Sequence, residues 1–156
     1  MKKFVFAVLI VSMIVSLAAC GAQKTDLTEG VELYKEGNCK GAIPYLDATI
    51  ANPETSMDMA YAYFLKGQCA EKAGELAKAY EHYYAAKRVT CYEVGNERRT
   101  SNNTIARSEY CQQILPKKLT KLAPSVGEEQ IQAITAKVDE ELSSIYMQRF
   151  QKRLSD

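Results

Sequence analysis

Apolar residues recur every three to four positions along much of the chain after residue 24, a spacing typical of amphipathic helices. This spacing predicts helices over residues 27–36, 40–51, 55–73 and 75–89. Turn-forming residues separate these segments at Gly37-Asn38, Asn52-Pro53 and Gly74. The first half of the domain is therefore expected to consist of helices joined by tight turns.

The helical pattern is less regular in the middle of the chain. Residues 92–103 are polar and rich in turn formers, and they are predicted to form a surface loop. Residues 105–115 are predicted to form a helix that Pro116 ends. A short helical piece is expected over residues 117–122, before Pro124.

A long helix is predicted at the C-terminal end. Ser125 and Glu128 have the S-x-x-E spacing of a capping box, after which a helix should follow. One stripe of this segment carries Ile131, Ile134, Val138, Leu142, Ile145 and Arg149, with Phe150 and Leu154 near its end. We expect this stripe to cover the preceding helices as a cap. The alternative is a helix that binds a partner or forms a coiled coil.

The stretch from Gly30 to Ala86 repeats itself with an offset of 37 residues. The offset pairs small and bulky residues in the same order: Gly30 with Gly67, Gly37 with Gly74, Ala42 with Ala79, Leu46 with Tyr83, and Thr49 with Ala86. This order resembles that of the tetratricopeptide repeat family, whose units of about 34 residues are helical hairpins. The resemblance is stronger in the second copy, because Thr49 and Asp26 depart from the family pattern in the first.

The resemblance implies an all-α fold with a short solenoid of helical hairpins. Two repeats and a degenerate third hairpin would occupy residues 29–122, and a capping helix would occupy residues 125–156. It also implies a concave face lined by the first helix of each hairpin, which the family uses to bind peptides or partner helices. On this basis Tyr34, Tyr63 and Lys66 are the expected groove residues.

The N-terminus has the pattern of a bacterial export signal. Two lysines precede an apolar run that is shorter than the roughly 20 residues of a membrane span. The run ends in Leu-Ala-Ala-Cys at Cys20, which resembles the lipobox of bacterial lipoproteins. The resemblance implies that residues 1–19 are removed, that Cys20 carries lipid, and that residues 20–28 form a tether.

In the lipoprotein family, the residue after the lipidated cysteine indicates whether the anchor lies in the inner or the outer membrane. Gly21 stands where an aspartate would favour retention in the inner membrane, so we expect an outer-membrane anchor facing the periplasm, where the host has an outer membrane. The alternative is an ordinary anchor helix that contains a cysteine by chance.

The net charge of the mature chain argues against nucleic acid as a partner. Removal of the two lysines of the signal leaves 18 basic residues against the 19 acidic ones, a net charge of −1. A nearly neutral domain has no electrostatic reason to bind nucleic acid. The mature chain is long enough for one domain with a modest core.

Four cysteines remain beside Cys20, which in an exported protein suggests two disulfides with three connectivities. The repeat geometry favours pairing Cys39 with Cys69 and Cys91 with Cys111. A metal site is the alternative, disfavoured because no C-x-x-C pair occurs and the chain has a single histidine, at position 82.

No catalytic motif is recognisable, and no cofactor or small-molecule substrate is expected. We expect a non-enzymatic envelope lipoprotein that binds a peptide or partner protein and assists assembly of an envelope complex. Two alternatives remain: a disulfide-stapled structural spacer, and a non-catalytic accessory subunit of an envelope enzyme.

Overall fold

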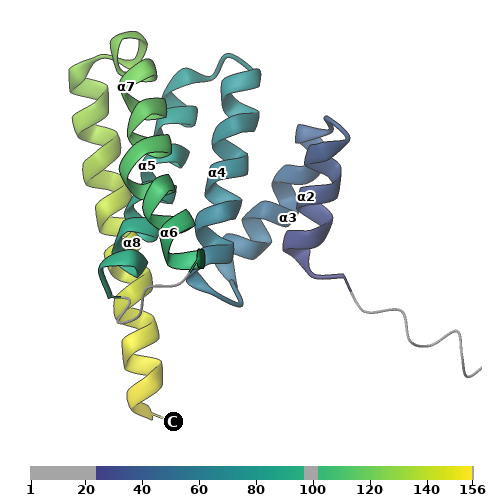
Figure 1. Cartoon of the computed structure of the whole chain (residues 1–156), viewed down its shortest axis with the longest axis vertical. Coiled ribbons are helices and arrows are strands. Elements are labelled where there is room, and N and C mark those ends of the chain that lie inside the picture. Colours follow the sequence, from purple (N-terminus) through teal and green to yellow (C-terminus); the bar gives the residue numbers. More distant parts are fainter. Residues whose placement is uncertain (1–23, 97–101, 156) are drawn as a thin grey trace, which may run out of the picture.

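The computed structural model describes residues 24–96 and 102–155, and every regular element within these ranges is a helix (Figure 1). The predicted all-α fold is confirmed. The helices are α2 (Asp26–Lys35), α3 (Cys39–Ala51), α4 (Ser56–Lys72), α5 (Leu76–Asn96), α6 (Asn102–Glu109), α7 (Leu115–Val126) and α8 (Glu128–Ser155), with a π-helical turn η1 (Tyr110–Ile114) before α7. None of the helices in the described ranges is both long and apolar enough to cross a membrane. The predicted signal segment and Cys20 lie outside those ranges.

Side chains fix the starts of the first helices. The Thr25 hydroxyl accepts from the Thr28 N–H at 3.2 Å, which caps α2. Thr55 and Asp58 form a reciprocal capping box that begins α4. At the other end of α4, Gly74 has a φ of +75°, a left-handed conformation that lets the chain turn into α5.

The first two hairpins, α2–α3 and α4–α5, close through the same contact. A Cβ added at Gly30 would lie 2.9 Å from Leu46 Cδ2, and one added at Gly67 would lie 2.6 Å from Tyr83 Cδ1. Leu46 and Tyr83 are both 0% exposed. Because the 37-residue offset pairs these two glycines and these two bulky residues, the repeat in the sequence is also a repeat of packing.

Both expected disulfides are present. The Cα atoms of Cys39 and Cys69 are 5.5 Å apart, and this bond joins the start of α3 to α4. The Cα atoms of Cys91 and Cys111 are 5.1 Å apart, and this bond joins α5 to η1. The first bond therefore holds the two hairpins together, and the second attaches the following segment to the second hairpin.

The predicted loop at 92–103 is wrong in its first part. Helix α5 continues to Asn96, and Tyr92 packs against Tyr146 of α8 with ring centroids 4.7 Å apart. This tertiary contact supports helix where the local sequence favours a loop. The helix α6 begins at Asn102, and residues 97–101 lie outside the described ranges.

The prediction that Pro116 ends a helix is also wrong. The chain stays helical through α6, η1 and α7, and Pro124 lies within the last turns of α7. In η1 the Leu115 N–H donates to the Tyr110 carbonyl, five residues back. This wider turn precedes the proline, whose ring would clash with the carbonyl of a regular α-helical turn. We refer to α6, η1 and α7 together as the arm.

Helix α8 packs along α5 and α7. Ile134, Val138 and Leu142 are buried, and Ile131 and Ile145 pack beside them, as the stripe predicts. The predicted capping box does not begin this helix, because Ser125 belongs to α7 and Gly127, with a φ of +86°, separates the two helices. The side chains of the remaining stripe residues, Arg149, Phe150 and Leu154, lie beyond those described.

Candidate interaction surface

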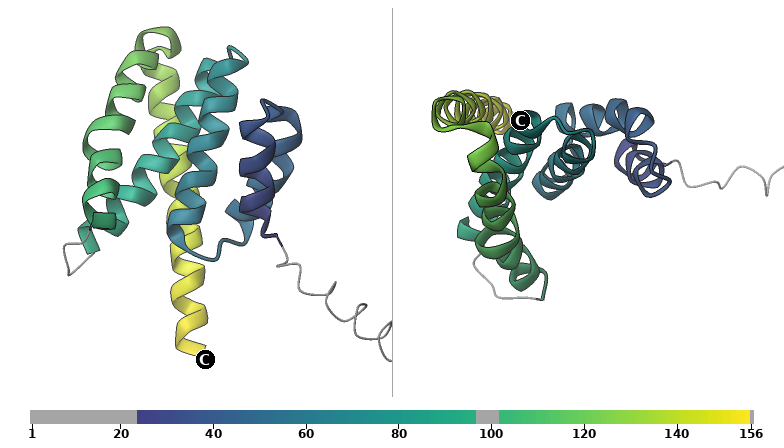
Figure 2. Two further views of the ribbon diagram at one scale, coloured as in Figure 1. Left: turned by 45° about the vertical axis from the view of Figure 1, so that its right-hand side comes forward. Right: turned by 90° about the horizontal axis from the view of Figure 1, so that it is seen from above.

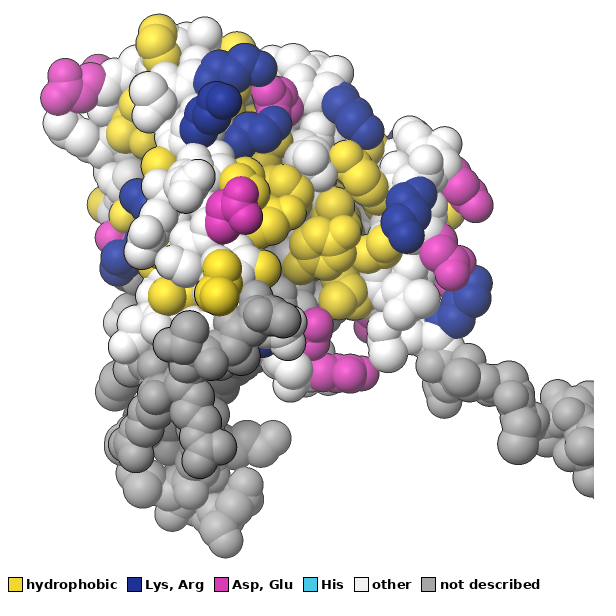
Figure 3. Space-filling view, viewed as in Figure 1, with side chains coloured by type: hydrophobic (Ala, Val, Ile, Leu, Met, Phe, Trp, Pro, Cys, Tyr) yellow, Lys and Arg dark blue, Asp and Glu magenta, His cyan; other side chains and the backbone are white. Residues whose placement is uncertain are grey.

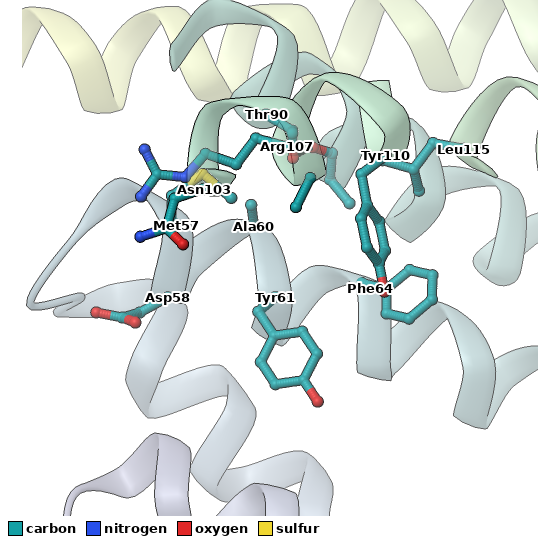
Figure 4. A pocket seen from close by; sticks show the side chains of 12 residues that line it. Met57, Asp58, Ala60, Tyr61, Phe64, Thr90, Asn103, Arg107, Tyr110 and Leu115 are labelled. Carbon is teal, nitrogen blue, oxygen red and sulfur yellow. Dashed lines mark hydrogen bonds between the residues drawn. The ribbon is translucent and has the colours of Figure 1, made fainter. Parts of the chain in front are cut away.

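A cleft opens between α4 and the arm. Both pack on α5, but within the described residues they make no backbone contact with each other. Seen from above, the arm runs out from the row formed by α5, α4, α3 and α2 (Figure 2, right). The cleft has a volume of about 430 Å³ and is lined by Met57, Asp58, Ala60, Tyr61, Phe64, Ala86, Thr90, Asn103, Ala106, Arg107, Tyr110 and Leu115 (Figure 4).

Three aromatic side chains form the middle of the cleft. Phe64 of α4 meets Tyr110 of η1 edge to face, with ring centroids 5.4 Å apart. Tyr61, one turn earlier on α4, is 40% exposed, and Tyr110 is 37% exposed. The floor below them is apolar and is formed partly by Ala60 and Ala86. An exposed aromatic rim over an apolar floor is the composition of a binding surface rather than of ordinary solvated surface.

A shared carboxylate joins α4 to the arm above the aromatic residues. Glu71 accepts from Lys118 Nζ at 2.8 Å, from Lys121 Nζ at 3.0 Å and from the Tyr83 hydroxyl at 2.8 Å. The hydrogen bond from Lys118, followed by that from Tyr83, lowers the pKa of Glu71 to about 2. Burial and then the Glu71 bond raise the pKa of Tyr83. The carboxylate stays ionised over the whole physiological range and links α4 to α7 beyond the residues that line the cleft.

The three predicted groove residues do not share one face. Tyr34 of α2 lies under the Lys72 ammonium, 4.3 Å from the ring centroid, and is near enough to Tyr61 and Tyr83 to influence their pKa values. It therefore belongs to the side of the molecule that carries the cleft.

Tyr63 and Lys66 lie on a different side of α4. Lys66 forms an ion pair with Asp47 of α3, and the Tyr63 ring is 6.3 Å from His82 of α5. Burial is the main cause that raises the pKa of Tyr63 to about 12. These two residues connect α4 to α3 and α5, and neither lines the cleft.

The sequence reasoning missed Tyr61, Phe64 and Tyr110. A signal for the first two was present, since aromatic residues three positions apart lie on one helix face. Tyr110 had no such signal, because its position depends on how the arm leaves α5.

His82 of α5 is half-buried and does not line the cleft. Its Nδ1 has no hydrogen-bond partner among the described atoms, and burial lowers the pKa of the imidazole to about 4. Among the described residues no cluster of three His, Cys, Asp or Glu side chains could hold a metal ion. The imidazole is therefore neutral at physiological pH and acts as a packing residue.

Comparison of the chain with protein-family models, with characterised proteins and with solved structures finds no match in any of the three. Membership of the tetratricopeptide family and of the lipoproteins stays a prediction from the sequence.

Proposed function

We propose that this protein is a protein-interaction module of the cell envelope, anchored to the membrane by a lipid on Cys20. It binds a peptide or a partner protein in the cleft between α4 and the arm, and it catalyses no reaction. The observation that carries the proposal is the pair of exposed tyrosines, Tyr61 and Tyr110, on either side of an apolar floor.

The chemistry of the cleft suits another polypeptide. Tyrosine offers a large contact area with few rotatable bonds, so it loses little entropy on binding, and it is enriched at protein interfaces. The cleft opens on a face where hydrophobic side chains gather in the middle and charged ones surround them (Figure 3). This arrangement of an apolar centre with a polar rim is typical of protein–protein interfaces.

The walls of the cleft are held in place before a partner arrives. The Cys91–Cys111 bond fixes η1 to α5, and Glu71 links α4 to Lys118 and Lys121 of α7. A preorganised site loses less conformational entropy on binding than a flexible one. Attachment to the membrane would raise the effective concentration of a partner in the same membrane, so modest affinity would suffice. A role in assembling an envelope complex is consistent with both properties.

A photo-crosslinking experiment tests this function. Benzoylphenylalanine replaces Tyr61 in the full lipidated protein, and in a matched control it replaces Tyr45 of α3, which is 39% exposed. We expect illumination of cells to give one discrete adduct from position 61 and none from position 45. The same adducts from both positions, or none from either, would refute the cleft as a binding site and favour the structural spacer.

A further inference from the structure

The charges around the cleft indicate what kind of segment binds there. We propose that the partner segment carries an apolar side chain for the cleft and acidic residues to one side of it, towards the C-terminal ends of α4 and α7. This inference rests on the proposed function and specifies the partner.

Basic residues gather at that end of the surface. The Lys118 and Lys121 ammoniums share the single carboxylate of Glu71, at 2.8 and 3.0 Å. Lys118 also lies 5.2 Å from the centroid of the Tyr83 ring, and Lys72 lies 4.3 Å from that of the Tyr34 ring. Three ammoniums against one carboxylate leave a surplus of positive charge.

The exposure of these groups makes the surplus available to a partner. The Lys121 side chain is 71% exposed, whereas Glu71 is 20% exposed and already accepts from three donors. An incoming carboxylate would therefore meet the ammonium before it met the acid. Glu109, the acidic residue in the sequence of the arm, lines a separate hollow with Val94.

The opposite end of the surface carries more acidic than basic side chains. Asp58 lines the cleft there, and its carboxylate accepts from Thr55 in the capping box of α4. Asp26 and Glu54 line an adjoining hollow together with Asp58 and Lys24. Arg107 also lines the cleft near Met57 (Figure 4), so three carboxylates stand against two cations at this end. Figure 3 shows acidic side chains below the hydrophobic surface and basic ones mainly above it. This polarity disfavours the reverse orientation of an acidic segment, because like charges would then face each other.

The distance between the apolar anchor and the acidic residues of the partner follows from the geometry of α4. Phe64 and Glu71 are seven residues apart on α4, which corresponds to a rise of about 10 Å. An extended segment covers that distance in about three residues. A helical segment covers it in about seven residues, or two turns. The acidic residues should therefore lie about three or about seven positions from the apolar anchor.

A random peptide display library presented to the full lipidated protein in detergent tests the inference. We expect the enriched peptides to carry an aromatic or aliphatic residue with Asp or Glu at one of these spacings. Their binding should fall about tenfold in Tyr61→Ser, the size of loss expected at an anchor contact.

Charge reversal then tests the basic end. Lys121→Glu should weaken the enriched peptides by roughly three- to tenfold at low salt, and by less at high salt. The matched control is Lys78→Glu: Lys78 is 66% exposed, also pairs with a single glutamate, and lies one helical turn before His82, away from the cleft. This control should bind as the unchanged protein does. Peptides with Glu replaced by Lys should lose binding to the unchanged protein, which keeps the test valid even if Lys121→Glu folds poorly.

Two outcomes would overturn the inference, and they are distinguishable. Peptides whose binding depends on Tyr61 but that show no acidic preference would refute the charge polarity and leave the proposed function standing. The absence of any enrichment that depends on Tyr61 would refute both.

Discussion

Removing the two disulfides one at a time separates what each contributes to the stability of the whole domain from what it contributes to the structure around the cleft. The test pair is Cys91→Ser with Cys111→Ser, and the matched control is Cys39→Ser with Cys69→Ser. The bonded cysteines are 20 and 30 residues apart, respectively. The chain-entropy relation for these loop lengths gives losses of about 3.3 and about 3.6 kcal/mol in the free energy of unfolding. Urea titration should therefore find two double variants of nearly equal stability.

The local consequences should differ. Helix α6 packs only on α5 and η1 among the described elements, and the Cys91–Cys111 bond is the covalent link between those two supports. Its removal should increase amide hydrogen exchange over residues 102–109 and weaken binding in the cleft. Removal of the Cys39–Cys69 bond should leave both unchanged. Equal exchange over residues 102–109 in the two variants would refute the view that the second disulfide shapes the cleft.

Three further predictions concern single residues. Gly67→Ala should lower the free energy of unfolding by roughly 1–3 kcal/mol, because its Cβ would lie 2.6 Å from the buried Tyr83 ring. Gly30→Ala should lower it by less, because the nearest atom there is at 2.9 Å. Urea titration measures both losses. The pKa of His82 is about 4 when folded against 6.5 in a model compound. The unfolded chain therefore binds a proton that the folded chain does not, and stability should fall as the pH decreases from about 6.5 to about 4. Cys20→Ser should abolish the incorporation of a labelled fatty acid into the protein.

Each of these predictions has a clear contrary result. Equal losses in the two glycine variants would show that the Tyr83 ring does not set the cost. For the histidine, the stability difference between the unchanged protein and His82→Leu isolates the imidazole, and a difference that stays constant with pH would contradict the argument. An unchanged protein that incorporates no labelled fatty acid would favour an anchor helix over lipid attachment.

The sequence predicts the first four helices well because their signals are local. Glycine turns and helical spacing both lie within a few residues of each boundary. The region after Cys91 is less predictable, because distant residues decide its structure. Tyr92 stays helical against Tyr146, and Pro116 is tolerated after a π-helical turn that the sequence does not reveal.

The cleft was predictable only in part. Tyr34 lies on the side of the molecule that carries the cleft, whereas the sequence did not indicate which face of α4 lines the cleft. Successive residues of a helix are about 100° apart, so Tyr61 and Tyr63 point about 200° apart around α4. The position of a residue within a degenerate repeat does not fix the rotation of the helix about its axis to that precision. The contact between Phe64 of α4 and Tyr83 of α5 fixes this rotation.

The two repeats carry different bulky residues at the same position, Leu46 in the first and Tyr83 in the second, and this difference has a thermodynamic consequence. Leu46 fills the space beside Gly30 and ends there, whereas Tyr83 fills the same space beside Gly67 and extends a hydroxyl to Glu71. The core of the second hairpin and the lysines of the arm therefore share a hydrogen-bonded carboxylate. A ligand that competes for those lysines alters the environment of a fully buried tyrosine. By linkage, any change that such a ligand makes in the free energy of unfolding of that hairpin equals the change that the folding of the hairpin makes in the free energy of ligand binding.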